Sequence, residues 1–212
     1  MNQRNGLIIV LSGFSGAGKG TIMKNLLKNY PDMYHLSISA TTRDMRPGEQ
    51  DGREYFFKTR EEFDDMIAKG EFLEYATYVG NSYGTPKAYV EQLALEGKDV
   101  ILEIEVQGAL QVKEIFPEAL LLFVTPPSAQ TLKERLVGRG TESEDVICQR
   151  LAISAKESHL MEKYDYLIVN DVLENSVREV HEIIQCEHFR TARNKSAIQE
   201  MQKELTIFSK GE

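Results

Sequence analysis

The chain has 212 residues, of which 42% are hydrophobic and 27% are charged, and its formal net charge is −8. This length and composition predict a globular protein with one sizeable core, and no low-complexity tract or internal repeat interrupts the sequence. The acidic balance argues against a nucleic acid as partner, because nucleic-acid binders usually carry a basic face. Any phosphate site must therefore be made by a few basic side chains within an acidic surface.

No apolar run approaches the length that a membrane-spanning helix needs, so no membrane partner is expected. The first apolar run begins at Leu7 and leaves no room for a signal peptide before it. Cys148 and Cys186 lack the spacing of metal ligands, and we expect reduced thiols in a cytoplasmic protein. The sequence leaves open whether the protein is a monomer or a homo-oligomer.

A glycine-rich segment lies between a predicted strand at residues 7–11 and a predicted helix at residues 22–30. Residues 13–21 read GFSGAGKGT and match the phosphate-binding pattern G-x4-G-K. In this pattern backbone N–H groups and a helix N-terminus face an anion, and Lys19 reaches the β- and γ-phosphates of a nucleotide. An ordinary glycine turn is the weaker alternative. Gly20 occupies the place of the usual hydroxyl residue, so the sequence assigns no direct protein ligand to a metal ion.

Residues 37–84 are expected to form a small, mixed, β-rich insert with little apolar mass of its own. A capping box at Thr59 predicts a helix within it that ends at Gly70. Arg43 and Arg46 lie on a polar loop, and their planar guanidinium groups are suited to grip a phosphate. A pair of solvated loop arginines is the alternative.

From Thr85, the expected cap of a helix, buried strands and helices alternate along the chain. Apolar runs predict strands at residues 100–105, 120–124 and 166–169, each followed by a helix. Apolar strands separated by helices require a parallel sheet that is covered on both faces. The predicted fold class is α/β, a P-loop-type parallel sheet flanked by helices, with the β-rich insert and a helical lid.

Two further groups of charges are candidates for a nucleotide site. Arg135 and Arg139 lie four residues apart on one helix face, and Arg150 lies on the next helix, beyond a Gly-Arg-Gly break. Converging arginines suit a lid that closes over transferring phosphates, with a charged surface hairpin as the alternative. Glu103 and Glu105 are expected on one side of an otherwise apolar strand, at the edge where α/β folds bind ligands.

The last part of the chain carries a separate pattern. Apolar residues repeat there at 3-4-3 spacing, namely Ile198, Met201, Leu205 and Phe208. Such a narrow stripe is expected either to pack on the protein's own core, which is the favoured alternative, or to pair between subunits.

Seven stretches together make the chain resemble the guanylate kinase family, from about Gly6 to Glu187. They are residues 12–19, 37–46, 80–85, 103–108, 126–128, 138–142 and 169–171. The resemblance implies transfer of a phosphoryl group from ATP to GMP, with Mg²⁺ as cofactor and dGMP as a second expected acceptor. It also implies a division of the chain, with a kinase core at residues 1–36 and 85–187, a lid at about 138–150, a GMP-binding insert at 37–84 and a helical extension at 188–212.

The resemblance carries over to named positions of this sequence. The residues implied in catalysis are Lys19, Arg43, Arg139 and Arg150. Those implied in binding ATP are Gly13, Phe14, Ser15, Gly16, Ala17, Gly18, Lys19, Gly20, Thr21, Arg135, Arg139 and Asn170. Those implied in binding GMP are Ser39, Arg43, Arg46, Tyr55, Glu74, Tyr83, Thr85, Glu103, Glu105 and Arg150. No direct metal ligand is assigned, and Mg²⁺ would be held by the ATP phosphates, with Thr21 or Glu105 reaching it through water.

The chemistry of guanine agrees with this implication. Its N1–H and N2–H groups lie side by side, so one carboxylate such as Glu74 can accept both, and Ser39 and Thr85 could donate hydroxyls to O6. A site built for those donors rejects adenine by ~10⁴. The chain departs from the family at Phe14, where many members have proline, and at Gly20, where many have serine. A catalytically inactive binding module and a kinase for another nucleoside monophosphate are the alternatives.

Overall fold

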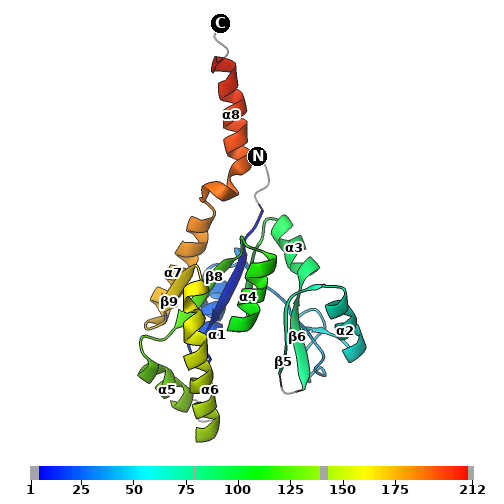
Figure 1. Cartoon of the computed structure of the whole chain (residues 1–212), viewed down its shortest axis with the longest axis vertical. Coiled ribbons are helices and arrows are strands. Elements are labelled where there is room, and N and C mark those ends of the chain that lie inside the picture. The colour runs from blue at the N-terminus through cyan, green and yellow to red at the C-terminus, as the bar shows by residue number, and fades with distance from the viewer. Residues whose placement is uncertain (1–4, 79, 139–142, 210–212) are drawn as a thin grey trace.

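The computed structural model describes residues 5–78, 80–138 and 143–209. Its core is a five-stranded sheet in the order β2-β7-β1-β8-β9, in which every neighbouring pair is parallel. The strands are β1 (Ile8–Gly13), β2 (Tyr34–Leu36), β7 (Asp99–Glu103), β8 (Leu120–Thr125) and β9 (Tyr166–Val169). The predicted parallel sheet is therefore confirmed (Figure 1).

Side chains of the central strand β1 point alternately into two buried clusters. Ile9 and Leu11 belong to the larger cluster, and Val10 between them belongs to the other. The larger cluster includes residues of α1 (Lys19–Asn29), α5 (Ala129–Gly138), α6 (Glu144–Glu157) and α7 (Leu173–Glu187). The other cluster includes residues of α3 (Lys87–Leu95) and α4 (Val106–Ile115). Helices thus cover both faces of the sheet, as buried parallel strands require.

A second, mixed sheet is built from the chain between β2 and α3. Its order is β4-β3-β6-β5, with β3 (Ala40–Thr41), β4 (Phe56–Phe57), β5 (Phe72–Tyr78) and β6 (Asn81–Pro86). β3 and β4 are parallel, whereas β6 is antiparallel to both β3 and β5. The helix α2 (Arg60–Ala68) begins at the predicted capping box, in which Thr59 and Glu62 each accept the other's backbone N–H. A small core of Ala40, Phe63 and Phe72 holds this unit together.

Two predicted element boundaries are wrong. The ladder between β1 and β7 ends at Glu103, and Glu105 is the N-cap residue of α4, so the two carboxylates do not share one side of a strand. Thr85 lies inside β6, opposite Glu74, and α3 begins only at Lys87. In both places long-range strand pairing decides the boundary, and the local cap or apolar signal is overridden.

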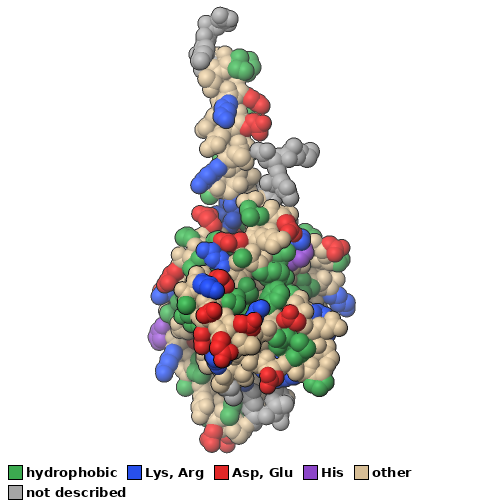
Figure 2. Space-filling model, turned by 90° about the vertical axis from the view of Figure 1, so that its right-hand side faces the viewer, with side chains coloured by type: hydrophobic (Ala, Val, Ile, Leu, Met, Phe, Trp, Pro, Cys, Tyr) green, Lys and Arg blue, Asp and Glu red, His purple; other side chains and the backbone are tan. Residues whose placement is uncertain are grey.

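The C-terminal segment leaves the body of the protein. A 3₁₀ turn, η1 (Ser158–Lys163), joins α6 to β9, and a second, η2 (Thr191–Arg193), leads from α7 into α8 (Lys195–Ser209). In Figures 1 and 2, α8 projects from the rounded body as a narrow column. The apolar stripe is exposed, from 39% for Ile198 to 81% for Phe208.

The favoured prediction that this stripe packs on the core is therefore wrong, and pairing between subunits stays a prediction. Within the described ranges, no helix combines the length and the apolar character that crossing a membrane requires.

Candidate active site

The loop between β1 and α1 depends on glycine at several positions. Gly13, Gly16 and Gly18 have φ angles of 140°, 94° and 98°, a region that residues with a side chain rarely adopt. A Cβ on Gly13 would lie 2.1 Å from the carbonyl oxygen of Val124, because β1 and β8 are paired there. The helix α1 begins immediately after this turn, at Lys19. The predicted succession of strand, glycine turn and helix start is confirmed.

Lys19 lies across the glycine loop. Its Nζ donates to the carbonyl oxygen of Gly13 at 2.7 Å and to that of Phe14 at 3.4 Å. The ammonium therefore stands beside the N-terminus of α1, where the helix dipole also favours an anion. Phe14 is buried, and its ring meets Phe123 edge-on at 4.9 Å between centroids. Phe14 thus anchors the loop in the core.

Side chains from two other parts of the core converge on the same loop. The Nη1 and Nη2 of Arg135 donate to the carbonyl oxygens of Ala17 at 3.3 Å and Asn170 at 2.8 Å. The Nδ2 of Asn170 also donates to Ala17, at 2.8 Å. Arg150 on α6 donates its Nη1 to the hydroxyl oxygen of Ser15 at 2.9 Å. The structure therefore brings three of the predicted site residues to the loop, namely Arg135, Asn170 and Arg150.

The carboxylates of Glu103 and Glu157 interact electrostatically with Lys19. A Cβ on Gly20 would lie 3.3 Å from Oε1 of Glu103, so the missing side chain at this position leaves room for that carboxylate. Desolvation raises the pKa of Glu103, Lys19 lowers it, and Glu105 raises it further. Desolvation also raises the pKa of Glu157 at the end of α6. The charge of Glu105 raises this pKa further, and that of Lys19 lowers it. Sequence reasoning missed Glu157, because an acid on a long amphipathic helix carries no distinguishing pattern.

The second sheet carries a buried carboxylate. Glu74 is 8% exposed, and its Oε1 accepts a 2.6 Å hydrogen bond from Oγ1 of Thr85, its neighbour across β5 and β6. A Cβ on Gly108 would lie 2.8 Å from Oε2, so the carboxylate also touches the first turn of α4. Burial raises the pKa of Glu74, and hydrogen bonds from Thr85 lower it. A buried carboxylate with a neutral hydroxyl as its side-chain donor is suited to accept further N–H groups.

Arg43 lies against aromatic rings on the loop after β3. Its guanidinium carbon is 5.4 Å from the ring centroid of Tyr55 and 5.7 Å from that of Phe57. The ring of Tyr55 in turn meets that of Tyr83 at 6.0 Å. The Nη2 of Arg43 donates to both carboxylate oxygens of Glu49, at 2.8 and 3.0 Å. Glu49 was not predicted, because a single acid in a loop rich in charges has no signal of its own.

Other predicted residues are less closely assembled. Arg46 is exposed and donates its backbone N–H to the same Glu49 carboxylate at 2.8 Å. Ser39 is partly buried, and Thr21 is exposed, as is Glu105. The predicted Arg139 lies outside the described residues.

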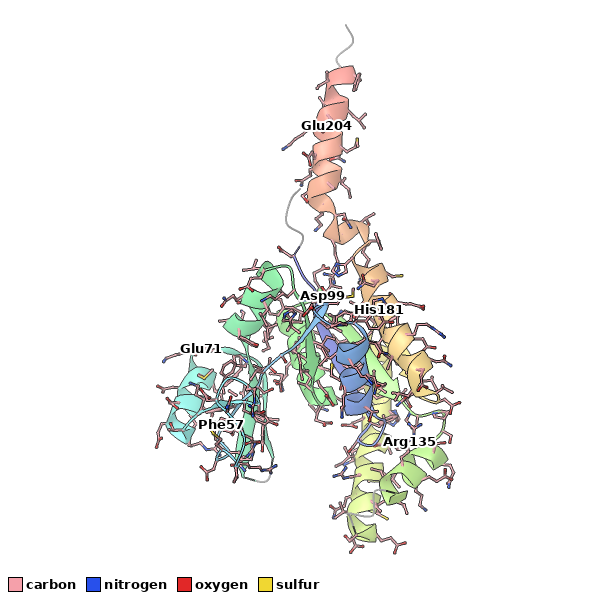
Figure 3. The ribbon with its side chains drawn as sticks, turned by 180° about the vertical axis from the view of Figure 1, so that it is seen from behind. Phe57, Glu71, Asp99, Arg135, His181 and Glu204 are labelled. Atoms are coloured by element: carbon pink, nitrogen blue, oxygen red, sulfur yellow. The ribbon has the colours of Figure 1, made fainter. Side chains whose placement is uncertain are left out.

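Polar side chains thus form two groups beside the carboxyl ends of the core strands. One group surrounds the glycine loop and includes Lys19 and Arg135, and the other belongs to the second sheet and includes Arg43 and Glu74. Figure 3 shows Phe57 of the second sheet and Arg135 of α5 on the two sides of the core, both at the end of the molecule away from α8. A family model described as guanylate kinase matches residues 5–187, which span both groups. The chain belongs to the guanylate kinase family.

Individual relatives agree with this membership. A guanylate kinase of Streptococcus thermophilus is 53% identical over 193 residues, which cover 91% of this chain and 92% of the relative. One of Bacillus anthracis is 51% identical over 205 residues, with 97% and 100% covered. A crystal structure of guanylate kinase from Anaplasma phagocytophilum matches with a TM-score of 0.69 and 34% identity, over 91% of this chain and 92% of that one. The resemblance drawn from the motifs is confirmed, and the chain is a nucleoside monophosphate kinase, a nucleotide-binding transferase.

Proposed function

We propose that this guanylate kinase family member phosphorylates GMP with ATP as the phosphoryl donor, giving GDP and ADP. The observation that carries the proposal is the buried carboxylate of Glu74, held by Thr85 and packed against Gly108 at the start of α4. Residues 37–84 would bind the acceptor, residues 1–36 and 85–187 the donor, and residues from about 138 to 150 would close over the phosphates.

Guanine would be read through N1–H and N2–H, which one carboxylate can accept together. Thr85 fixes the orientation of Glu74 through Oε1, and burial makes an unpaired carboxylate costly. Adenine has an acceptor at N1 and no N2 amine, so it would leave Glu74 without donors and be rejected by ~10⁴. The sugar of dGMP differs at a position that this carboxylate does not read, so dGMP would be a second acceptor.

The acceptor phosphate would meet Arg43 and Arg46, with Tyr55 and Tyr83 beside them. Arginine's planar donors suit phosphate oxygens, and aromatic rings restrict the motion of the guanidinium group. An oxygen of the GMP phosphate attacks the γ-phosphorus of ATP, and the bond to the β,γ-bridging oxygen breaks, so ADP leaves with the electron pair. Positioning and charge neutralisation supply the rate of such a transfer, and no protein base is required.

On the donor side, Lys19 and the N–H groups of the glycine loop would hold the β- and γ-phosphates. Binding would exchange the present bonds of Lys19 to Gly13 and Phe14 for bonds to phosphate oxygens. Arg150, which bonds Ser15, and Arg135, which bonds Ala17, would neutralise charge that develops during transfer. Asn170, which contacts the loop at Ala17, would border the adenosine side.

A magnesium ion fits this arrangement as a partner of the nucleotide rather than of a protein cage. In the described ranges, no three metal-ligating side chains form a cluster. Mg²⁺ keeps several waters and binds through one or two carboxylates together with substrate phosphates. Glu103 lies beside Gly20 of the loop, and Thr21 and Glu105 would reach the ion through water. When bound, the ion would offset charge on the phosphates.

The test is ADP formation at saturating Mg·ATP with GMP, dGMP, AMP and dTMP as acceptors. GMP should give the highest kcat/KM, and Glu74→Gln should lower it by about 100-fold or more, since two hydrogen bonds to a buried charge are worth about 1.5–3 kcal/mol each. The matched control is Glu71→Gln at an exposed residue directly before β5, labelled in Figure 3, which should behave as wild type. Preference for AMP or dTMP would contradict the proposal, and no ADP with any acceptor would favour an inactive binding module.

A further inference from the structure

One carboxylate outside the predicted set links the two arginines of the acceptor loop. Glu49 accepts Nη2 of Arg43 with both of its oxygens, at 2.8 and 3.0 Å, and Oε2 also accepts the backbone N–H of Arg46 at 2.8 Å. The backbone N–H of Glu49 donates back to the carbonyl oxygen of Arg46 at 3.1 Å. Three hydrogen bonds to the carboxylate and one backbone bond therefore close a compact turn around it.

The guanidinium group of Arg43 is held from several directions at once. Glu49 fixes Nη2, the carbonyl oxygen of Asp44 accepts Nη1 at 2.7 Å, and the rings of Tyr55 and Phe57 lie 5.4 and 5.7 Å away. The side chains of Arg43 and Glu49 are only 13% and 17% exposed, so the pair is sheltered from water. Nε–H and one N–H of Nη1 have no hydrogen-bond partner among the described residues. Donors therefore remain for a ligand while the group itself is fixed.

We propose that Glu49 is a positioning residue for the acceptor phosphate. It sets the direction in which Arg43 presents its free donors, and it ties that direction to the backbone at Arg46. The inference rests on the proposed function, because the ligand is the phosphate of a nucleoside monophosphate. Hydrogen bonds from Arg43 and Arg46 hold the pKa of Glu49 below its ordinary value, so the carboxylate is charged at neutral pH.

The alternative is that Glu49 occupies the donors of Arg43 in the absence of ligand and is displaced by the phosphate when GMP binds. The contacts favour positioning for two reasons. Displacement would break three hydrogen bonds, including one to a backbone N–H that cannot turn away with the arginine side chain. It would also leave a sheltered carboxylate without a donor beside a dianion, which costs more than leaving the pair intact. The two roles predict opposite signs for the effect of removing the carboxylate.

The test compares Glu49→Ala and Glu49→Gln with wild type in steady-state kinetics and in binding of GMP and of guanosine without ATP. Misplacing a binding group such as the Arg43 guanidinium by about 1 Å can lower the rate by up to about 100-fold. KM for GMP should therefore rise by about 10- to 100-fold in Glu49→Ala, and by less in Glu49→Gln, which keeps one hydrogen-bond acceptor. KM for ATP and the affinity for guanosine, which lacks the phosphate, should stay within about twofold of wild type.

The matched control is Glu54→Gln, the same substitution on the same loop. Glu54 accepts hydrogen bonds from Nε of Arg53 and from the backbone N–H of Gln50, and among the described residues no hydrogen bond joins it to Arg43. This variant should bind GMP as wild type does, and a loss of similar size would overturn the proposal. Equal or tighter binding of GMP by Glu49→Ala would also overturn it, as would an equal loss for guanosine, which would indicate general damage to the second sheet. Wild-type turnover of GMP tests the proposed function separately, because only ratios to wild type bear on Glu49.

Discussion

A single methyl group added at Gly108 should separate recognition of the base from stability of the fold. This glycine lies in the first turn of α4, and a Cβ built on it would stand 2.8 Å from Oε2 of Glu74 and 3.2 Å from its Cγ. Ordinary van der Waals contact begins at 3.4 Å, so the carboxylate must retreat by about 0.6 Å. Glu74 is buried and bonded to Thr85, and it has little freedom to move without losing that bond.

The expected size of the effect follows from that displacement. A misplacement of 1 Å at a reacting or binding group can cost about 100-fold in rate, so about 0.6 Å should lower kcat/KM for GMP by about 10-fold or more in Gly108→Ala. Alanine is also the better helix former, by up to about 1 kcal/mol. The substitution should therefore leave the melting temperature close to that of wild type.

Initial rates of ADP formation with varied GMP, and then with varied ATP, measure the effect. KM for ATP should not change, because the clash lies on the acceptor side of the molecule. Glu114→Ala, an exposed substitution on the same helix, controls for a change in the stability of α4. A Gly108→Ala enzyme with wild-type kcat/KM for GMP would refute the assignment of Glu74 to the base.

Three further outcomes follow from contacts described above. Lys19→Met should lower kcat by about 100-fold or more, as removal of one preorganised donor does, and thermal melting should show little change because the Nζ of Lys19 bonds the loop carbonyls of Gly13 and Phe14. Asp99→Ala should lower the free energy of unfolding in urea by about 2–4 kcal/mol, because Asp99 accepts the buried N–H of Leu7 and pairs with His188, both at 2.8 Å. Burial lowers the pKa of His181 in the folded protein. As pH drops, the imidazole is therefore protonated first in the unfolded state, and the free energy of unfolding should fall as pH drops through about 6.5. Denaturation between pH 5 and 8 should show that slope in wild type and a smaller one in His181→Phe, which keeps a ring stacked on Tyr30.

The core was predictable from sequence because its patterns have one physical explanation. Every residue of β8 is buried. A strand covered on both faces needs apolar side chains in both directions, and it therefore reads as an unbroken apolar run in the sequence. The glycine loop was predictable for a similar reason, since Gly13 and Gly18 adopt angles that other residues avoid. The capping box at Thr59 also formed as predicted, because its two hydrogen bonds depend on residues three apart in the chain.

The errors and omissions lie where distant residues decide the outcome. Thr85 reads locally as a cap, but pairing with Glu74 across two strands draws it into β6. Glu105 follows an apolar run, but the pairing of β7 with β1 ends at Glu103, and Glu105 takes the N-cap position of α4. The role inferred for Glu49 depends on its hydrogen bond to Arg43, and the spacing of residues in the sequence does not predict that contact.

The way α8 joins the body divides the chain into two cooperative units. His188, which pairs with Asp99, and Arg193, which donates to the carbonyl oxygen of Glu118, bond the segment before α8 to the body. From Lys195 to Phe208 every side chain is exposed, and a helix of 15 residues has little stability of its own in water. Amide protons of α8 in an isolated chain should therefore exchange orders of magnitude faster than those of β1, and a protease should trim the chain just beyond Asn194 while the kinase body stays whole.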